Sequence, residues 1–258
     1  MDLYPLLRAE VDGVEPTAAE LATLAFASYG HFTAMQVRGG HVRGLTHHLD
    51  RLAAANRELF GAGLDGDRLR ELIRHALDGV ADASVRVNMH GNLPGGPVVT
   101  VVTVRPPATP PTTVALLPVD YHRTVTHIKR PGDFGQAYYG RHAVRQGFDD
   151  ALLTTPDQVV TEAAIANVGF FDGTSVVWPD APMLRGITLQ LVELRLADLP
   201  ARHQVVRLEQ VPGFAAAFVT NSQGIAAVTR IGEHKFSVDE QLMAALHRAY
   251  DTAPADLI

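Results

Sequence analysis

The chain has 258 residues and a formal net charge of -6, and 47% of its residues are hydrophobic whereas 19% are charged. This balance is typical of a soluble globular protein and excludes a disordered chain, and the acidic excess argues against nucleic acid as a partner. The absence of cysteine excludes disulfides, thiolate metal sites and a cysteine nucleophile. No apolar run is long enough for a transmembrane helix and the N-terminus does not resemble a signal peptide, so we expect a cytoplasmic protein that does not act at a membrane.

The first 105 residues predict a small α/β domain. Apolar periodicity and turn signals predict a strand over 25–38, helices over 46–60 and 67–77, and strands over 84–90 and 97–104. Thr46 is the expected N-cap of the first helix, and residues 90–96 predict a turn-rich hairpin loop.

A proline-rich run follows this domain. Four of the residues over 106–113 are prolines, which favour an extended and semi-rigid linker. We therefore predict a boundary there, between a domain over 1–105 and a larger one over 114–258. A long loop within a single domain is the alternative.

The second part alternates short strands with helices, which again predicts an α/β fold. The expected strands lie over 114–119, 151–154, 159–161, 168–171, 175–178, 215–220 and 226–231, and the expected helices over 134–146, 187–196 and 239–249. Gly147 suits the C-terminal end of the first of these helices.

Lysine is almost absent from the chain. Lys129 and Lys235 are the only lysines among 22 basic residues. Arginine stays protonated and cannot act as an amine nucleophile, whereas a lysine in a suitable environment can. Each of the two lysines is therefore a candidate for amine chemistry. The alternative is that both are ordinary surface lysines without a chemical role.

Four segments carry polar residues at fixed spacings: H-L-D-R-L at 48–52, R-T-V-T-H-I-K at 123–129, V-T-E-A-A-I-A-N-V at 160–168 and L-R-G-I-T at 184–188. In this order, between Tyr29 and Ile231, they resemble the motifs of the class IV aminotransferases. The resemblance implies a two-domain enzyme of the pyridoxal 5'-phosphate (PLP) fold type IV, with a small α/β domain and a larger pseudo-barrel domain. It also implies a homodimer.

The resemblance gives each motif a role. Lys129 would form the Schiff base with PLP, and Arg51 would bind the phosphate, because a planar guanidinium pairs well with phosphate oxygens. Glu162 would contact the pyridine nitrogen and keep it protonated, which lets the ring accept electrons. Further cofactor contacts would come from Ile187, Thr188, Thr220, Asn221 and Ser222.

The substrate side departs from the family pattern. The family strand F-E-x-[IV]-R is F-T-A-M-Q at 32–36 here, and a threonine at this place resembles the 4-amino-4-deoxychorismate lyases of the same fold. We expect Phe32 and Thr33 to contact the substrate.

Alternation along 84–90 places Arg86, Asn88 and His90 on one strand face. We expect Arg86 and His90 to bind the substrate carboxylate. An exposed Arg86, or one paired with Asp82, is the alternative.

These observations predict PLP-dependent transfer of an amino group between an amino acid or amine and a 2-oxo acid, both of them small-molecule substrates. A lyase that releases pyruvate is the alternative, favoured by Thr33, Asn221 and the apolar residues 163–166. A PLP-free binding protein on the same fold is a further alternative, against which Lys129 weighs. The scattered histidines predict no metal site.

Overall fold

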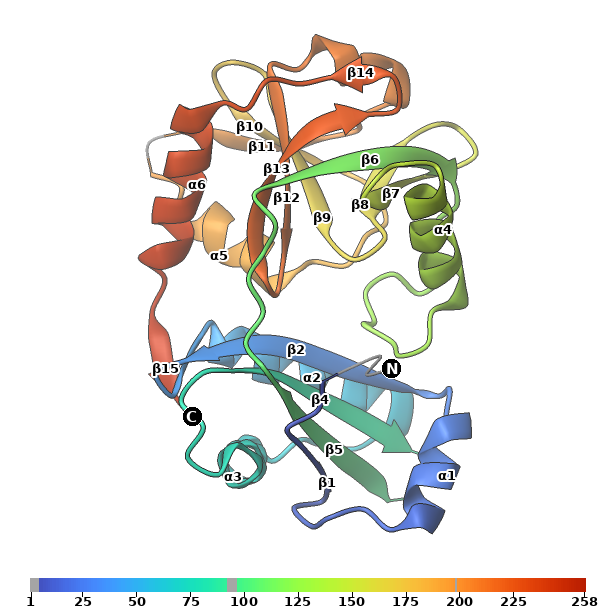
Figure 1. Cartoon of the computed structure of the whole chain (residues 1–258), viewed down its shortest axis with the longest axis vertical. Coiled ribbons are helices and arrows are strands. Elements are labelled where there is room, and N and C mark those ends of the chain that lie inside the picture. The colour runs from blue at the N-terminus through green and yellow to red at the C-terminus, as the bar shows by residue number, and fades with distance from the viewer. Residues whose placement is uncertain (1–4, 92–96, 198) are drawn as a thin grey trace. The chain divides into compact units, whose positions relative to one another are not determined.

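The computed structural model describes residues 5–91, 97–197 and 199–258, and they form two compact units (Figure 1). Unit 1 comprises Met1–Ala108, Ile128–Gly132 and Pro254–Ile258, and unit 2 comprises Thr109–His127 and Asp133–Ala253. The change from unit 1 to unit 2 after Ala108 falls within the proline-rich run. The segment that contains Lys129 groups with unit 1, because the Phe32 N–H donates to the Lys129 carbonyl at 2.7 Å.

Unit 1 is built on a six-stranded antiparallel sheet with the order β1-β5-β4-β2-β3-β15. The strands are β1 (Arg8–Val11), β2 (Gly30–Arg38), β3 (His41–Arg43), β4 (Ala83–Gly91), β5 (Val98–Arg105) and β15 (Ala255–Leu257). Because side chains alternate along a strand, Val85 and Val87 of β4 face the same side as Met35 and Val37 of β2, and all four are buried.

Helices α2 (Leu45–Phe60) and α3 (Gly66–Leu77) pack on this apolar face, and their leucines complete the core of unit 1. The strand expected from residue 25 is wrong at its start, because α1 (Ala18–Phe26) occupies that region and β2 begins only at Gly30. A capping box between Thr17 and Glu20 stabilises the start of α1. The expected N-cap at Thr46 is also wrong: Gly44 caps α2 in a left-handed conformation, with φ 67, and no side chain bonds there.

Unit 2 contains a nine-stranded sheet that curls on itself. Its main path is β11-β10-β9-β12-β13-β6-β7-β8, and β14 pairs with β13. The strands are β6 (Thr113–Asp120), β7 (Asp150–Thr154), β8 (Val160–Ala163), β9 (Asn167–Phe171), β10 (Val176–Pro179), β11 (Ala201–Gln204), β12 (Ala216–Asn221), β13 (Gly224–Ile231) and β14 (His234–Lys235). Strand β8, at the end of the path, contacts β9 and β10, so apolar side chains such as Leu152, Phe170 and Val228 fill the inside of the curl.

Three α-helices and a 3₁₀ helix cover the sheet of unit 2. They are α4 (Phe134–Arg145), α5 (Ile187–Arg195), α6 (Glu240–Asp251) and η1 (Leu208–Gly213). Helix α4 packs on β7, and α5 and α6 pack together on β12 and β13 around Trp178 and Phe218 (Figure 1). The helices predicted over 134–146, 187–196 and 239–249 are confirmed within a few residues, and Gly147 has the predicted left-handed conformation after α4, with φ 78.

The proline-rich run carries no helix or strand over 106–112, and its first part is bonded to unit 1. The Ala108 N–H donates to Gln36 Oε1 at 3.0 Å, and the Ala108 carbonyl accepts from Arg38 Nη2 at 2.8 Å. In the loop expected over 90–96, residues 92–96 lie outside the described residues. No helix in the described ranges is both long and apolar enough to cross a bilayer.

Candidate functional site

Lys129 and Arg86 lie around the aromatic ring of Phe32 in unit 1. Lys129 Nζ is 4.9 Å from the ring centroid, and Arg86 Cζ is 3.6 Å from the same centroid. Both distances are within the range of cation–π attraction. The ring of Phe32 therefore has both an amine and a guanidinium against it. The backbone bond between Phe32 and Lys129 fixes the lysine beside β2.

Arg86, Asn88 and His90 share one face of β4, as the alternation predicted. Phe32 is opposite Asn88 in the register, so both side chains share the face of Arg86, whose Nε donates to Asn88 Oδ1 at 2.7 Å. His90 is opposite Gly30 and is buried, and its Nδ1 has no hydrogen-bond partner among the described residues. Burial lowers the pKa of His90, and the charge of Arg86 lowers it further. Asp82, considered as a partner of Arg86, accepts the Gly39 N–H instead.

On the opposite face of β2, Thr33 forms a polar cluster with Arg51 and His48 of α2. Arg51 Nη2 donates to Thr33 Oγ1, and Thr33 Oγ1 is 2.6 Å from His48 Nδ1. Burial lowers the pKa of Arg51 to about 10, which leaves the guanidinium charged at neutral pH, and burial also places the pKa of His48 well below 6.5. Arg51 Nε is buried and has no hydrogen-bond partner among the described residues. Thr33 thus faces Arg51, whereas its neighbour Phe32 faces Lys129.

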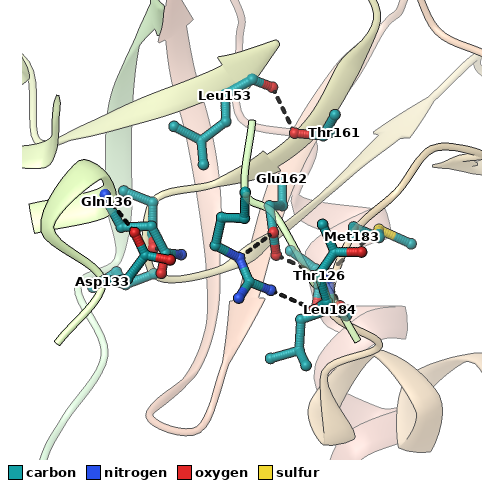
Figure 2. Close-up of polar contacts among 12 residues, drawn as sticks. Thr126, Asp133, Gln136, Leu153, Thr161, Glu162, Met183 and Leu184 are labelled. Carbon is teal, nitrogen blue, oxygen red and sulfur yellow. Dashed lines mark hydrogen bonds and ion pairs between the residues drawn. The ribbon is translucent and has the colours of Figure 1, made fainter. Parts of the chain in front are cut away.

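In unit 2, Glu162 is paired with Arg123 in the protein interior. Arg123 Nε donates to Glu162 Oε1 at 2.8 Å, and the two side chains are only 3% and 6% exposed. The Leu184 N–H donates to Glu162 Oε2 at 3.2 Å, and Arg123 Nη2 donates to the Thr126 carbonyl at 2.6 Å (Figure 2). Next to Thr126, Val125 has φ 51, a left-handed conformation that a β-branched residue rarely adopts. Arg123 therefore links the Glu162 carboxylate to a strained turn that leads toward Lys129.

Asn167 connects β9 to the start of α5. Its Nδ2 donates to the Leu184 carbonyl at 2.6 Å, and its Oδ1 accepts the Gly186 N–H at 3.0 Å. A Cβ at Gly186 would lie 2.2 Å from Asn167 Oδ1, so the close approach requires glycine. Because Leu184 also bonds to Glu162, the segment before α5 is held from two sides.

The N-terminus of α5 lies beside the turn between β12 and β13. Thr188 Oγ1 donates to the Asn221 carbonyl at 2.6 Å, which ties the first turn of α5 to that hairpin. Thr220 Oγ1 is buried and has no hydrogen-bond partner within the described ranges. Backbone N–H groups in the first turn of a helix lack intrahelical acceptors. Ile187 lies in the first turn of α5, and Ser222 lies in the turn between β12 and β13. This part of unit 2 therefore offers hydrogen-bond donors to an anion.

Residues 30–231 match the family model described as amino-transferase class IV. The chain belongs to the class IV aminotransferases. A comparison with curated proteins found no match.

Solved structures of similar fold include a provisionally named 4-amino-4-deoxychorismate lyase from Legionella pneumophila, at 21% identity over 88% of this chain and 92% of that chain, with a TM-score of 0.80. The PLP-bound form of a hypothetical aminotransferase from Mycobacterium tuberculosis matches at 19% identity over 95% and 97%, with a TM-score of 0.78. The branched-chain amino acid aminotransferase from Escherichia coli matches at 16% identity over 95% and 93%, with a TM-score of 0.82. The α/β fold is therefore that of the fold type IV enzymes.

The residues that we predicted for this class IV aminotransferase fall into two groups. Unit 1 carries Lys129 and Arg51 together with the four substrate candidates Phe32, Thr33, Arg86 and His90. Unit 2 carries Glu162, Ile187, Thr188, Thr220, Asn221 and Ser222. In the described part of the chain, no three His, Asp or Glu residues are grouped as metal ligands would be.

Sequence reasoning missed Arg123 and Asn167, which hold the predicted residues in place. Both belong to the motifs that resemble the family, at the first position of R-T-V-T-H-I-K and the eighth of V-T-E-A-A-I-A-N-V. Their positions in these motifs could have marked them as functional residues. Motif spacing alone did not say that Arg123 meets Glu162 or that Asn167 meets the segment before α5.

Replacement of Asn167 by alanine should lower the free energy of unfolding by about 2 to 3 kcal/mol, because the Leu184 carbonyl and the Gly186 N–H lose their shared partner. Urea unfolding followed by circular dichroism measures the loss. Gln241→Ala removes an exposed amide from α6 and serves as the control, with an expected change within about 0.5 kcal/mol. Equal losses in the two variants would contradict the role of Asn167.

Proposed function

We propose that this class IV aminotransferase uses PLP to transfer an amino group between an amino acid or amine and a 2-oxo acid. Besides family membership, one observation carries the proposal: Lys129 Nζ and the Arg86 guanidinium lie around the ring of Phe32. An amino acid and a 2-oxo acid both present a carboxylate next to the reacting carbon. A guanidinium for the carboxylate and an amine for the reacting carbon, both placed against one aromatic ring, match that pattern.

The donors and acceptors of the chain suit PLP, whose phosphate carries acceptor oxygens and whose protonated ring nitrogen is a donor. The buried Nε of Arg51 and the buried Oγ1 of Thr220 lack partners among the described residues, as expected for groups that bind phosphate. The Glu162 carboxylate is an acceptor held in one orientation by Arg123. The other proposed cofactor contacts are Ile187, Thr188, Asn221 and Ser222.

When bound, PLP withdraws electrons from the bond that breaks at the substrate α carbon. Lys129 Nζ would hold the cofactor, then take the proton from the α carbon of the amino substrate and return one when a 2-oxo acid is converted. Arg86 would bind the substrate carboxylate and orient the α carbon, and Phe32 would shield the amine from water on one side. His90, on the face of Arg86, would be neutral because its pKa is lowered.

A lyase that eliminates pyruvate is the second candidate. Ala163 and Ala164 are almost completely buried, and these apolar side chains support a lyase because they offer no hydroxyl groups to an amino acid carboxylate. Thr33 gives less support, since its hydroxyl is bonded to Arg51 and His48. Both reactions would use Lys129 in the same way.

Absorption spectra of the purified protein with PLP test the proposal. We expect a band near the visible edge that bleaches when D- or L-alanine is added, and that returns when a 2-oxo acid follows. A band that alanine leaves unchanged, with repeated release of pyruvate from 4-amino-4-deoxychorismate, would replace the transaminase by the lyase. A protein that is colourless after incubation with excess PLP and removal of the free cofactor would overturn both and favour a PLP-free binding protein.

A further inference from the structure

We propose that Thr33 and His48 are positioning residues that hold the Arg51 guanidinium in the orientation that binds the phosphate of PLP. The proposal rests on the proposed function, because it takes Arg51 as the phosphate-binding residue. It gives Thr33 a role on the cofactor side, whereas the sequence suggested contact with the substrate. All three residues belong to unit 1.

The chemistry of the side chains fixes the direction of the bond between Arg51 and Thr33, and the tautomer of His48 sets the direction of the second bond. Arg51 Nη2 can only donate, so Thr33 Oγ1 is the acceptor of that bond. The hydroxyl proton of Thr33 is then available for His48 Nδ1, 2.6 Å away. In the proposed arrangement His48 Nδ1 accepts this proton, which requires a neutral ring with its own proton on Nε2.

The surroundings of His48 favour this neutral form. His48 is 4% exposed and Thr33 is completely buried, so neither side chain has water as an alternative partner. Burial lowers the pKa of His48, and the charge of Arg51 lowers it further. A protonated His48 would present an N–H to Thr33 and displace the hydroxyl proton. The neutral ring thus keeps the Thr33 oxygen directed at Arg51.

The cluster leaves the buried Nε–H donor of Arg51 without an acceptor among the described residues. Nη2 is bonded to Thr33, whereas the buried Nε has no partner in the part of the chain that the structure describes. A guanidinium is planar and rigid, so fixing Nη2 also fixes the direction of the Nε–H bond. A phosphate oxygen is the acceptor that suits such a donor. A threonine hydroxyl, being neutral, achieves this without cancelling the positive charge of Arg51.

A purely structural cluster would have different consequences. If Thr33 and His48 merely fasten α2 to β2, their loss would destabilise unit 1 and weaken binding of every form of the cofactor. If they position Arg51, their loss would weaken binding of PLP, whereas pyridoxal, which lacks the phosphate, would bind as before.

Dissociation constants for PLP and for pyridoxal, measured by absorbance titration, separate these cases. We expect Thr33→Val to bind PLP about tenfold more weakly with no change for pyridoxal, and Thr33→Ser, which restores the hydroxyl, to recover most of the PLP affinity. Thr100→Val is the matched control, because Thr100 is a buried threonine on the same face of the same sheet. Equal weakening of PLP and pyridoxal in Thr33→Val, or none for PLP, would overturn the proposal.

A second pair of variants keeps the test decisive if Thr33→Val fails to fold. His48→Asn keeps an acceptor near the position of Nδ1 and should retain phosphate selectivity, whereas His48→Leu should lose it about as far as Thr33→Val. Loss of selectivity in both variants, or in neither, would contradict the proposed hydrogen bonding. Failure of the unsubstituted protein to bind PLP at Lys129 would instead refute the proposed function. This result distinguishes a failure of the proposed function from a failure of the positioning role.

Discussion

Lys129→Arg is expected to lower kcat/KM for amino transfer at least a thousandfold while the protein stays folded. A thousandfold corresponds to about 4 kcal/mol of transition-state stabilisation. The arginine keeps the positive charge beside Phe32, but its guanidinium stays protonated and neither bonds to an aldehyde nor accepts a proton. Steady-state kinetics with the best amino donor measure the loss, and circular dichroism checks the fold.

The chain supplies its own control for this prediction. Lys235 is the only other lysine, and it lies exposed on β14, so Lys235→Arg should leave the kinetics unchanged. Borohydride reduction of the PLP-loaded protein, followed by peptide mass mapping, should place the cofactor on Lys129 alone. Activity retained in Lys129→Arg, or cofactor trapped on Lys235, would refute the role of Lys129.

Arg123→Met is expected to lower the free energy of unfolding by about 3 to 5 kcal/mol. The methionine fills a similar volume but leaves the Glu162 carboxylate buried without its cation, and removal of one partner of a buried ion pair carries this cost. It also removes the bond to the Thr126 carbonyl, which holds the strained turn at Val125. Denaturant unfolding without added cofactor measures the effect.

Two further variants distinguish the loss of the buried ion pair from a general effect of losing an arginine. Arg202→Met breaks an exposed pair with Asp172, whose side chains are 43% and 25% exposed, and should cost less than about 1 kcal/mol. The double variant Arg123→Met with Glu162→Met should recover much of the stability, because no buried charge remains. A loss in Arg123→Met no greater than in Arg202→Met would show that Glu162 tolerates the loss of its partner.

Most of the longer helices and strands, and the family, were predictable from the amino-acid sequence. Alternating valines predicted β4 and β5, apolar spacing predicted the main helices, and Gly147 predicted the end of α4, because these signals act over a few residues. The order of four motifs along the chain predicted the family, which the family model confirms. Short edge strands such as β1, β11 and β15 escaped prediction, because three or four residues carry too little periodicity and depend on their partners.

The contacts between side chains far apart in the chain were not predictable from the sequence. Alternation predicts that Phe32 and Thr33 point to opposite faces, but not that α2 covers one of them and brings Arg51 and His48 to Thr33. The pairing of Arg123 with Glu162 joins residues 39 positions apart, a separation at which motif spacing carries no geometric information. The grouping of Lys129 with unit 1 likewise depends on a backbone bond to distant β2. Such contacts arise from the packing of elements far apart in the chain, so the sequence named the candidate residues and the fold assigned their partners.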